Sequence, residues 1–233
     1  RPAASRTQGQ VIVRARTPTV GLAVFDLDGT ITWRDSFVPY VAGFLRRHPA
    51  YCRRLWRVPG PLLRYLLDRD RGRLKESLII GLLRGVDRAT LDAWTNTFAE
   101  ELIASGTRPL ALEQIRMHRD DRDRLVLLSA SPDLYVTRIG ERLRFDEVIC
   151  TGVRWDGDRL DGHLTTQNRR AEEKARCIEQ LRVRCPGMRV VAYGNSASDL
   201  PHLQLADDGW LISTRSGLTQ RAAALGLRTA SWG

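Results

Sequence analysis

The sequence predicts an α/β protein with a doubly wound, mostly parallel sheet and an all-helical insertion after its first strand. Three observations carry this prediction. Short apolar runs alternate with helix-length amphipathic segments in the second half of the chain, as strands and crossover helices do. One further apolar run stands alone near residue 22. Between this run and the others, apolar residues recur at helical spacing only.

Length and composition agree with one domain that carries an insertion. The chain has 233 residues, of which 42% are hydrophobic and 27% charged, so it can bury a sizeable core. No apolar run approaches the ~20 residues that span a bilayer. The 4 cysteines form no C-x-x-C pair and the 4 histidines do not cluster. This pattern gives no zinc signature and indicates reduced thiols in a cytoplasmic protein.

In chain order, we expect residues 1–19 to form a flexible basic arm. Residues 20–35 open the core with a buried strand that ends at Asp26. Residues 36–110 form the helical cap, which prolines punctuate. Residues 111–233 complete the core. Its expected strands are 125–128, 147–151, 189–193, 210–212 and 227–230, its helices 132–143, 171–183, 198–205 and 216–225, with a hairpin turn at 155–158.

The net charge of +10 attracts anions, which include phosphorylated metabolites, acidic lipids and nucleic acid. Among the 37 basic residues only Lys75 and Lys174 are lysines. We interpret the excess of arginine as a codon bias. Because the arginines are scattered along the chain, their charge does not establish nucleic-acid binding, and we expect no nucleic-acid partner.

In sheets of this kind ligands bind at the carboxyl ends of the strands. The first strand ends in Asp26-Leu27-Asp28-Gly29-Thr30. Two carboxylates at i and i+2 repel each other and call for a cation or a shared proton. Hard oxygen ligands without His or Cys nearby favour Mg²⁺. The alternative is an Asp-Gly turn that closes a strand.

Three more polar segments follow expected strands or begin expected helices. Ser129, followed by Ala130, can hold a phosphate oxygen or cap the next helix. Lys174 is a surface lysine, or a compact cation between a carboxylate and a phosphoryl oxygen. Asn195 and Asp199 can supply oxygens to a cation, and Asp199 can equally cap a short helix.

Together and in this order, these segments resemble the motifs of the haloacid dehalogenase (HAD) superfamily. D-x-D-G-T corresponds to residues 26–30, the second motif ends at Ser129, Lys174 is the third, and residues 194–199 resemble the acidic fourth motif. The resemblance covers about residues 20–230. The insertion is similar to the type-one cap of subfamily IB. That branch contains phosphoserine phosphatases and phosphatidylglycerophosphatase C-like enzymes. Segments 32–37 and 168–174 are similar to its less characterised bacterial members.

The resemblance implies a Mg²⁺-dependent phosphomonoester hydrolase that acts on a small phosphorylated metabolite or a phospholipid head group. Asp26 would form an aspartyl-phosphate, and Asp28 would act as the acid and base. Ser129, Ala130 and Lys174 would bind the phosphate. The implied metal ligands are Asp26, Asp28, Asn195 and Asp199. A phosphotransferase, or a basic binding protein with little turnover, remains an alternative.

Two features bear on metal affinity and specificity. The family usually has Asp where Asn195 stands, so we expect weaker metal binding. Asp35 falls where phosphoserine phosphatases recognise the substrate amine, and it is equally a helix cap.

A basic, aromatic-bearing segment of the cap would contact anionic membrane, or form a solvated helix face. Its basic residues are Arg46, Arg47, Arg53, Arg54, Arg57 and Arg64.

Overall fold

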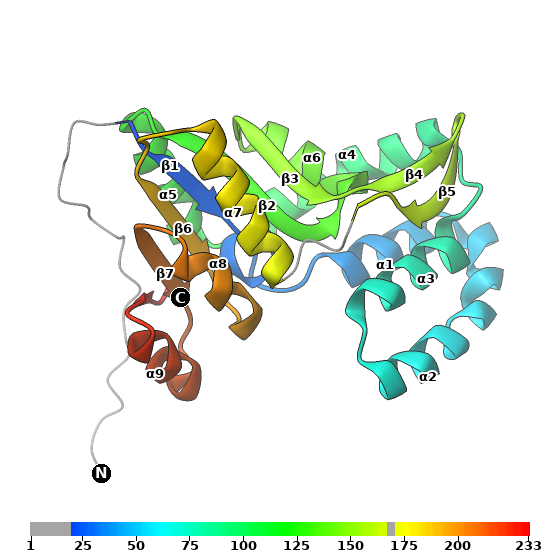
Figure 1. Cartoon of the computed structure of the whole chain (residues 1–233). Helices are drawn as coiled ribbons and strands as arrows, with labels where there is room; N and C mark the ends of the chain where they lie inside the picture. The colour runs from blue at the N-terminus through cyan, green and yellow to red at the C-terminus, as the bar shows by residue number, and fades with distance from the viewer. Residues whose placement is uncertain (1–19, 167–170) are drawn as a thin grey trace, which may run out of the picture.

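A computed structural model describes residues 20–166 and 171–233 and arranges them around one parallel sheet (Figure 1). All neighbouring strands of this sheet are parallel, in the order β3-β2-β1-β6-β7-β8. The predicted fold class is therefore confirmed. The expected arm at 1–19 and residues 168–170 of the family-like segment lie outside the described residues. The strands are β1 (Leu22–Phe25), β2 (Arg124–Pro132), β3 (Glu147–Thr151), β6 (Val190–Gly194), β7 (Asp208–Ile212) and β8 (Arg228–Ala230).

The central strand β1 is apolar throughout because helices cover both faces of the sheet. Leu22 and Val24 pack in the cluster on the face of α7 (Glu172–Arg184), α8 (Leu200–Gln204) and α9 (Ser216–Ala224). Ala23 and Phe25 point to the other face, toward the helices α5 (Pro109–Asp120) and α6 (Asp133–Arg142). This alternation follows from the two-residue period of a strand.

The sequence pattern predicted no helix over 111–124, whereas α5 occupies most of that stretch. Its buried face consists of Ala111, Gln114, Ile115 and His118. Two of these four residues are polar, so the apolar periodicity that marks a helix is weak here. Likewise β2 continues four residues beyond the expected 125–128, because a register irregularity lets it go on pairing with β3 as far as Pro132.

Within residues 36–110, where the helical insertion was expected, the chain forms helices. Pro49 and Pro59 stand at the first positions of η2 and α2, and the side chains of Asp70 and Asp87 cap α3 and α4. The expected hairpin forms as β4 (Val153–Asp156) and β5 (Arg159–Leu164), and Leu160 pairs with Gly85 and Val86 in the middle of this insertion. The helices are α1 (Phe37–Arg47), the 3-10 helix η2 (Pro49–Arg57), α2 (Pro59–Asp68), α3 (Arg71–Leu83) and α4 (Arg88–Ser105).

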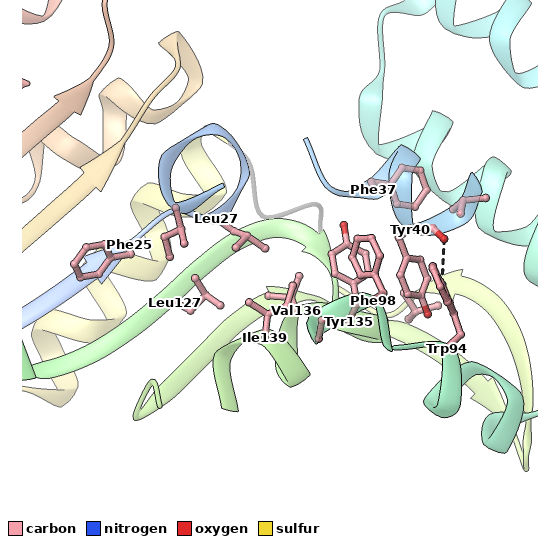
Figure 2. Packing of buried hydrophobic residues seen from close by; sticks show 14 of the residues in the cluster. Phe25, Leu27, Phe37, Tyr40, Trp94, Phe98, Leu127, Tyr135, Val136 and Ile139 are labelled. Atoms are coloured by element: carbon pink, nitrogen blue, oxygen red, sulfur yellow. Dashed lines mark hydrogen bonds between the residues drawn. The ribbon is translucent and has the colours of Figure 1, made fainter. Parts of the chain in front are cut away.

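One hydrophobic cluster joins the sheet to the insertion. Figure 2 shows it running from Phe25 on β1 to Tyr40 and Trp94 on α1 and α4. The indole Nε1 of Trp94 donates to the carbonyl oxygen of Tyr40 at 3.1 Å. By contrast, η2 and α2 contain no buried residue. The insertion is thus anchored through α1 and α4, while η2 and α2 stay on its outside.

Candidate active site

The first strand ends in a tight turn. Asp28 and Gly29 have the backbone angles of a type II turn, with φ of −76° and +81°. A β-carbon at Gly29 would also lie 2.0 Å from Nδ2 of Asn195, so the amide of Asn195 covers the turn closely. Glycine is therefore required twice, for its positive φ and for the approach of Asn195.

Asp26, Lys174 and Asp199 form a buried ionic trio. Lys174 Nζ, in the first turn of α7, lies 2.6 Å from Asp26 Oδ1 and 2.8 Å from Asp199 Oδ1. The Oδ2 atom of Asp26 accepts one bond from the Thr30 hydroxyl at 3.2 Å. Burial of the side chain raises the pKa of Asp26 to about 7, against the attraction of Lys174.

The other two members of the trio are shifted toward their charged forms. Burial lowers the pKa of Lys174, but its two carboxylate partners outweigh this effect and hold its pKa above the ordinary value. At Asp199 burial is likewise outweighed by Lys174 and holds the pKa low. Asp199 Oδ2 also accepts from the backbone and hydroxyl of Ser196. His202, buried behind Asp199, has its pKa lowered by burial to about 3 and is neutral.

Asp28 has a different environment, made of hydroxyl groups. Its Oδ1 accepts from the backbone N and the hydroxyl of Ser36 at 2.8 and 2.5 Å, and its Oδ2 accepts from the hydroxyl of Ser131 at 2.5 Å. Burial and the negative charge of Asp35 raise the pKa of Asp28, and the serine hydroxyls oppose that rise. The hydroxyl of Ser36 also lies 3.0 Å from the hydroxyl of Tyr135.

The second strand end meets the helical insertion. Ser129 is fully buried, and its Oγ accepts from the backbone N of Ser131 at 3.1 Å. The carbonyl oxygen of Ala130 accepts from Thr151 and from the ammonium of Lys75. Because Lys75 belongs to α3, this contact brings a cation of the insertion to the strand end.

The structure brings Asp26, Asp28, Ser129 and Lys174 to the same edge of the sheet, as the sequence predicted from their order. Asp35 instead is exposed and accepts from the backbone N of Phe37 at 3.0 Å, an Asx-turn contact one residue before Ser36, the N-cap of α1. Within residues 20–166 and 171–233, no group of three or more His, Cys, Asp or Glu side chains is placed to hold a metal ion.

Sequence reasoning missed four residues of this region. The hydroxyls of Ser36 and Ser131 hold Asp28, Lys75 reaches Ala130, and His202 lies behind Asp199. Two signals were present. Ser131 lies two residues after Ser129, on the same side of an extended strand. The rarity of lysine singles out Lys75 as much as Lys174.

Fold and site define a class: a doubly wound α/β hydrolase with a strand-end carboxylate paired to a buried lysine. Residues 23–204 match the family of haloacid dehalogenase-like hydrolases. The chain belongs to this family, as its motifs predicted, and it is an enzyme of that hydrolase class. None of the described helices is both long enough and apolar enough to cross a membrane.

Three relatives show the extent of the similarity. The protein CicA of Caulobacter vibrioides is 34% identical over 189 residues, which are 80% of this chain and 83% of CicA. A Bordetella pertussis protein of unknown function has a TM-score of 0.77 at 24% identity, covering 92% of this chain and 100% of that chain. A probable phosphoserine phosphatase of Vibrio cholerae has a TM-score of 0.70 at 14% identity, and the match covers 93% of this chain and 62% of that chain. The two solved structures share the fold.

Proposed function

We propose that this hydrolase is a phosphatase that cleaves phosphomonoesters through an aspartyl-phosphate on Asp26. The observation that carries the proposal is the asymmetry of the Asp26 carboxylate. Oδ1 is held by Lys174, whereas Oδ2 has, among the residues that the structure describes, only the 3.2 Å contact with Thr30. A fixed carboxylate with one weakly bonded oxygen is suited to attack a phosphorus atom. Membership of the hydrolase family supports the same reaction class.

The reaction would proceed in two displacements. Oδ2 of Asp26 bonds to phosphorus while the bond from phosphorus to the leaving oxygen breaks, and Asp28 donates its proton to that oxygen. Asp28, now ionised, then takes a proton from water, and the hydroxide oxygen displaces Asp26 from phosphorus. The raised pKa of Asp28 suits the first step, because burial makes this carboxyl keep its proton more readily.

The developing charge on the phosphoryl oxygens needs positive partners. Lys174 is fixed beside Asp26 and supplies an ammonium, and the Ser129 hydroxyl supplies a donor at the second strand end. Because Lys174 already contacts two carboxylates, its orientation is set before the substrate arrives. Asp199 therefore acts here as the residue that positions Lys174.

The donor chemistry around Asp26 fits Mg²⁺. All candidate ligands are oxygens, and those of Asp26 and Asn195 lie beside the turn at Gly29, where Asp28 also offers its backbone carbonyl. Both carboxylate oxygens of Asp28 already accept hydrogen bonds from serines. When bound, the ion would screen the phosphate from the anionic nucleophile. Asp26, Asn195 and the carbonyl of Asp28 would hold it, with Asp199 in support.

The substrate is proposed to be a small phosphorylated metabolite or a phospholipid head group. Lys75 supports an anionic substrate, because it places a cation of the insertion at the strand end that includes Ser129 and Ala130. The helical insertion over 36–110 is proposed as the cap that encloses the leaving group. A cytoplasmic location stays a prediction from the reduced cysteines.

The test is to trap the intermediate. The protein is mixed with an aryl phosphate labelled with radioactive phosphorus, with and without Mg²⁺, and quenched in acid. We expect Mg²⁺-dependent label on the protein that hydroxylamine removes, because acyl phosphates are cleaved by it. Turnover without any trapped or hydroxylamine-sensitive label would contradict the covalent route. Transfer of label to added glycerol in preference to water would identify a phosphotransferase, and absence of turnover a binding protein.

A further inference from the structure

The helices η2 and α2 carry an unusual concentration of exposed apolar side chains. Neither helix buries a single residue, although both are rich in leucine and aromatic residues. Trp56 is 74% exposed and Leu67 is 82% exposed. We call the set the η2–α2 surface; its apolar members are Leu55, Trp56, Leu62, Leu63, Leu66 and Leu67.

The leucines of α2 form one stripe along the helix. Their positions 62, 63, 66 and 67 follow the i, i+1, i+4, i+5 spacing that keeps side chains on one face. Tyr65, on the opposite side of the helix, is less exposed than the leucines on either side of it. The apolar face of this amphipathic helix is therefore turned outward, the reverse of a helix that contributes to a core.

The sequence that contains and flanks these two helices is strongly basic. Residues 46–73 contain 9 arginines and 2 aspartates, a net charge of +7 out of +10 for the whole chain. Arg53, Arg57 and Arg64 have no carboxylate within 4.0 Å among the described residues. The guanidinium of Arg57 lies 5.4 Å from the ring of Trp56, so a cation and the most exposed aromatic ring share one place.

We propose that the η2–α2 surface docks on an anionic lipid bilayer. Outward leucines and a tryptophan suit the boundary between head groups and acyl chains, and unpaired arginines suit acidic head groups. A second copy of the chain is disfavoured, because it would bring two basic surfaces against each other. Nucleic acid would match the arginines but leave the leucines against water and phosphate.

The position of the surface allows such docking. Figure 1 shows α2 at the outer end of the insertion, remote from β7 and α9 at the opposite side of the sheet. The insertion is held to the sheet through α1 and α4, so an outward α2 has no part in that anchoring. Docking therefore requires no rearrangement of the candidate active site.

The test is co-sedimentation of the full chain with vesicles of phosphatidylcholine, alone or mixed with phosphatidylglycerol. We expect binding to the mixed vesicles only, weakened by salt. Leu63→Glu with Leu67→Glu should abolish it. Arg53→Gln, Arg57→Gln and Arg64→Gln together should weaken it roughly a hundredfold, since three basic residues near an anionic surface are lost. Vesicles should also blue-shift tryptophan emission, and Trp56→Phe should remove most of that shift.

Matched controls make the result specific. Val183 on α7 is 81% exposed, and Val183→Glu should leave vesicle binding unchanged. The triple change at Arg116, Arg215 and Arg221, which are exposed elsewhere, should have less than a threefold effect. Circular dichroism and hydrolysis of a water-soluble ester report folding and the proposed activity separately.

Three outcomes would overturn the proposal. The first is no binding of the parent chain to mixed vesicles. The second is equal binding by the Leu63→Glu, Leu67→Glu variant and the Val183→Glu control. The third is a parent dimer in analytical ultracentrifugation that the leucine variant dissociates, without vesicle binding, which would assign the surface to a second copy. Loss of ester hydrolysis with intact vesicle binding would instead count against the proposed function alone.

Discussion

Asp26 and Asp28 leave the same strand two residues apart, and the fold gives them opposite surroundings. Asp26 is buried and Asp28 is half-buried, and loss of solvent is the largest effect that raises the pKa of each. Asp26 is bonded to a full positive charge on Lys174, whereas the partners of Asp28 in the described part of the chain are neutral groups of Ser36 and Ser131. An ammonium stabilises the ionised carboxylate, and hydroxyls do so more weakly.

This difference shows how two carboxylates at one turn can have different roles. Carboxylates of equal intrinsic acidity become a nucleophile and a proton donor when their partners differ in charge. The type II turn at Asp28 and Gly29 separates the two side chains, so one faces α7 and the other faces α1 and β2. The predictions below aim at this contrast, beginning with the largest effect.

Asp26→Asn removes the proposed nucleophile while keeping its shape. We expect kcat for a generic phosphate ester to fall by roughly 10⁴-fold or more, because no other oxygen is aligned to attack. The measurement is phosphate release with saturating Mg²⁺, beside circular dichroism. Asp156→Asn, on the exposed side of β4, is the matched control and should keep full activity. Substantial turnover by the Asp26 variant would remove the covalent mechanism.

Asp28→Asn should lower kcat by less, about 10²- to 10⁴-fold, because it removes acid and base assistance but leaves the attacking carboxylate in place. The loss should be smaller for an ester with an acidic leaving group, which departs without a proton. Ser131→Ala tests the support of Asp28 and should lower kcat about tenfold, since one hydrogen bond to the carboxylate is lost. If kcat falls by the same factor for both esters, Asp28 does not protonate the leaving oxygen.

Asn195→Asp adds a negative charge near the Asp26 carboxylate and leaves the surroundings of the Asp28 carboxylate unchanged. We expect half-maximal activity at an Mg²⁺ concentration lower by on the order of tenfold, because the Coulomb gain is partly offset by repulsion from Asp26. Titration of activity against Mg²⁺, with metal binding followed by calorimetry, measures the effect. An unchanged or weaker Mg²⁺ requirement would show that Asn195 is not a ligand.

The sequence was sufficient for the sheet and for the strand-end positions, because apolar runs and their polar ends are local signals. The apposition of Asp26 and Lys174, which lie 148 residues apart, was implied by the family resemblance, because the residues around Lys174 by themselves left a surface lysine open. The partners of Asp28 were beyond such reasoning. Ser36 and Ser131 come from a helix start and a strand extension, and their approach depends on packing of the insertion against the sheet.

The same limit explains α5 and α2. The buried face of α5 contains Gln114 and His118. The ring nitrogens of His118 lie 2.7 Å from Asp123 Oδ2 and 2.8 Å from the hydroxyl of Tyr193, partners that the sequence does not reveal. The leucines of α2 have the periodicity of a buried helix, yet they face outward. Periodicity predicts that a helix has an apolar face, but it does not say whether protein, solvent or another surface covers that face.

Asp35→Asn is the mildest change and separates two interpretations of that residue. Asn caps helices as well as Asp does, so the contact with Phe37 and the stability should persist. The negative charge of Asp35 raises the pKa of Asp28, so its removal lowers that pKa. Asp28 would then lose its proton at lower pH, and the alkaline limb of kcat should move down by about half a pH unit or less, since the exposed charge is screened. A full pH–rate profile with a generic ester measures this shift, and an unchanged limb would mean that Asp28 is not the acid that sets it.

If Asp35 recognises a substrate amine instead, kcat/KM of the Asp35→Asn variant should fall for an amine-bearing ester and stay constant for one without the amine.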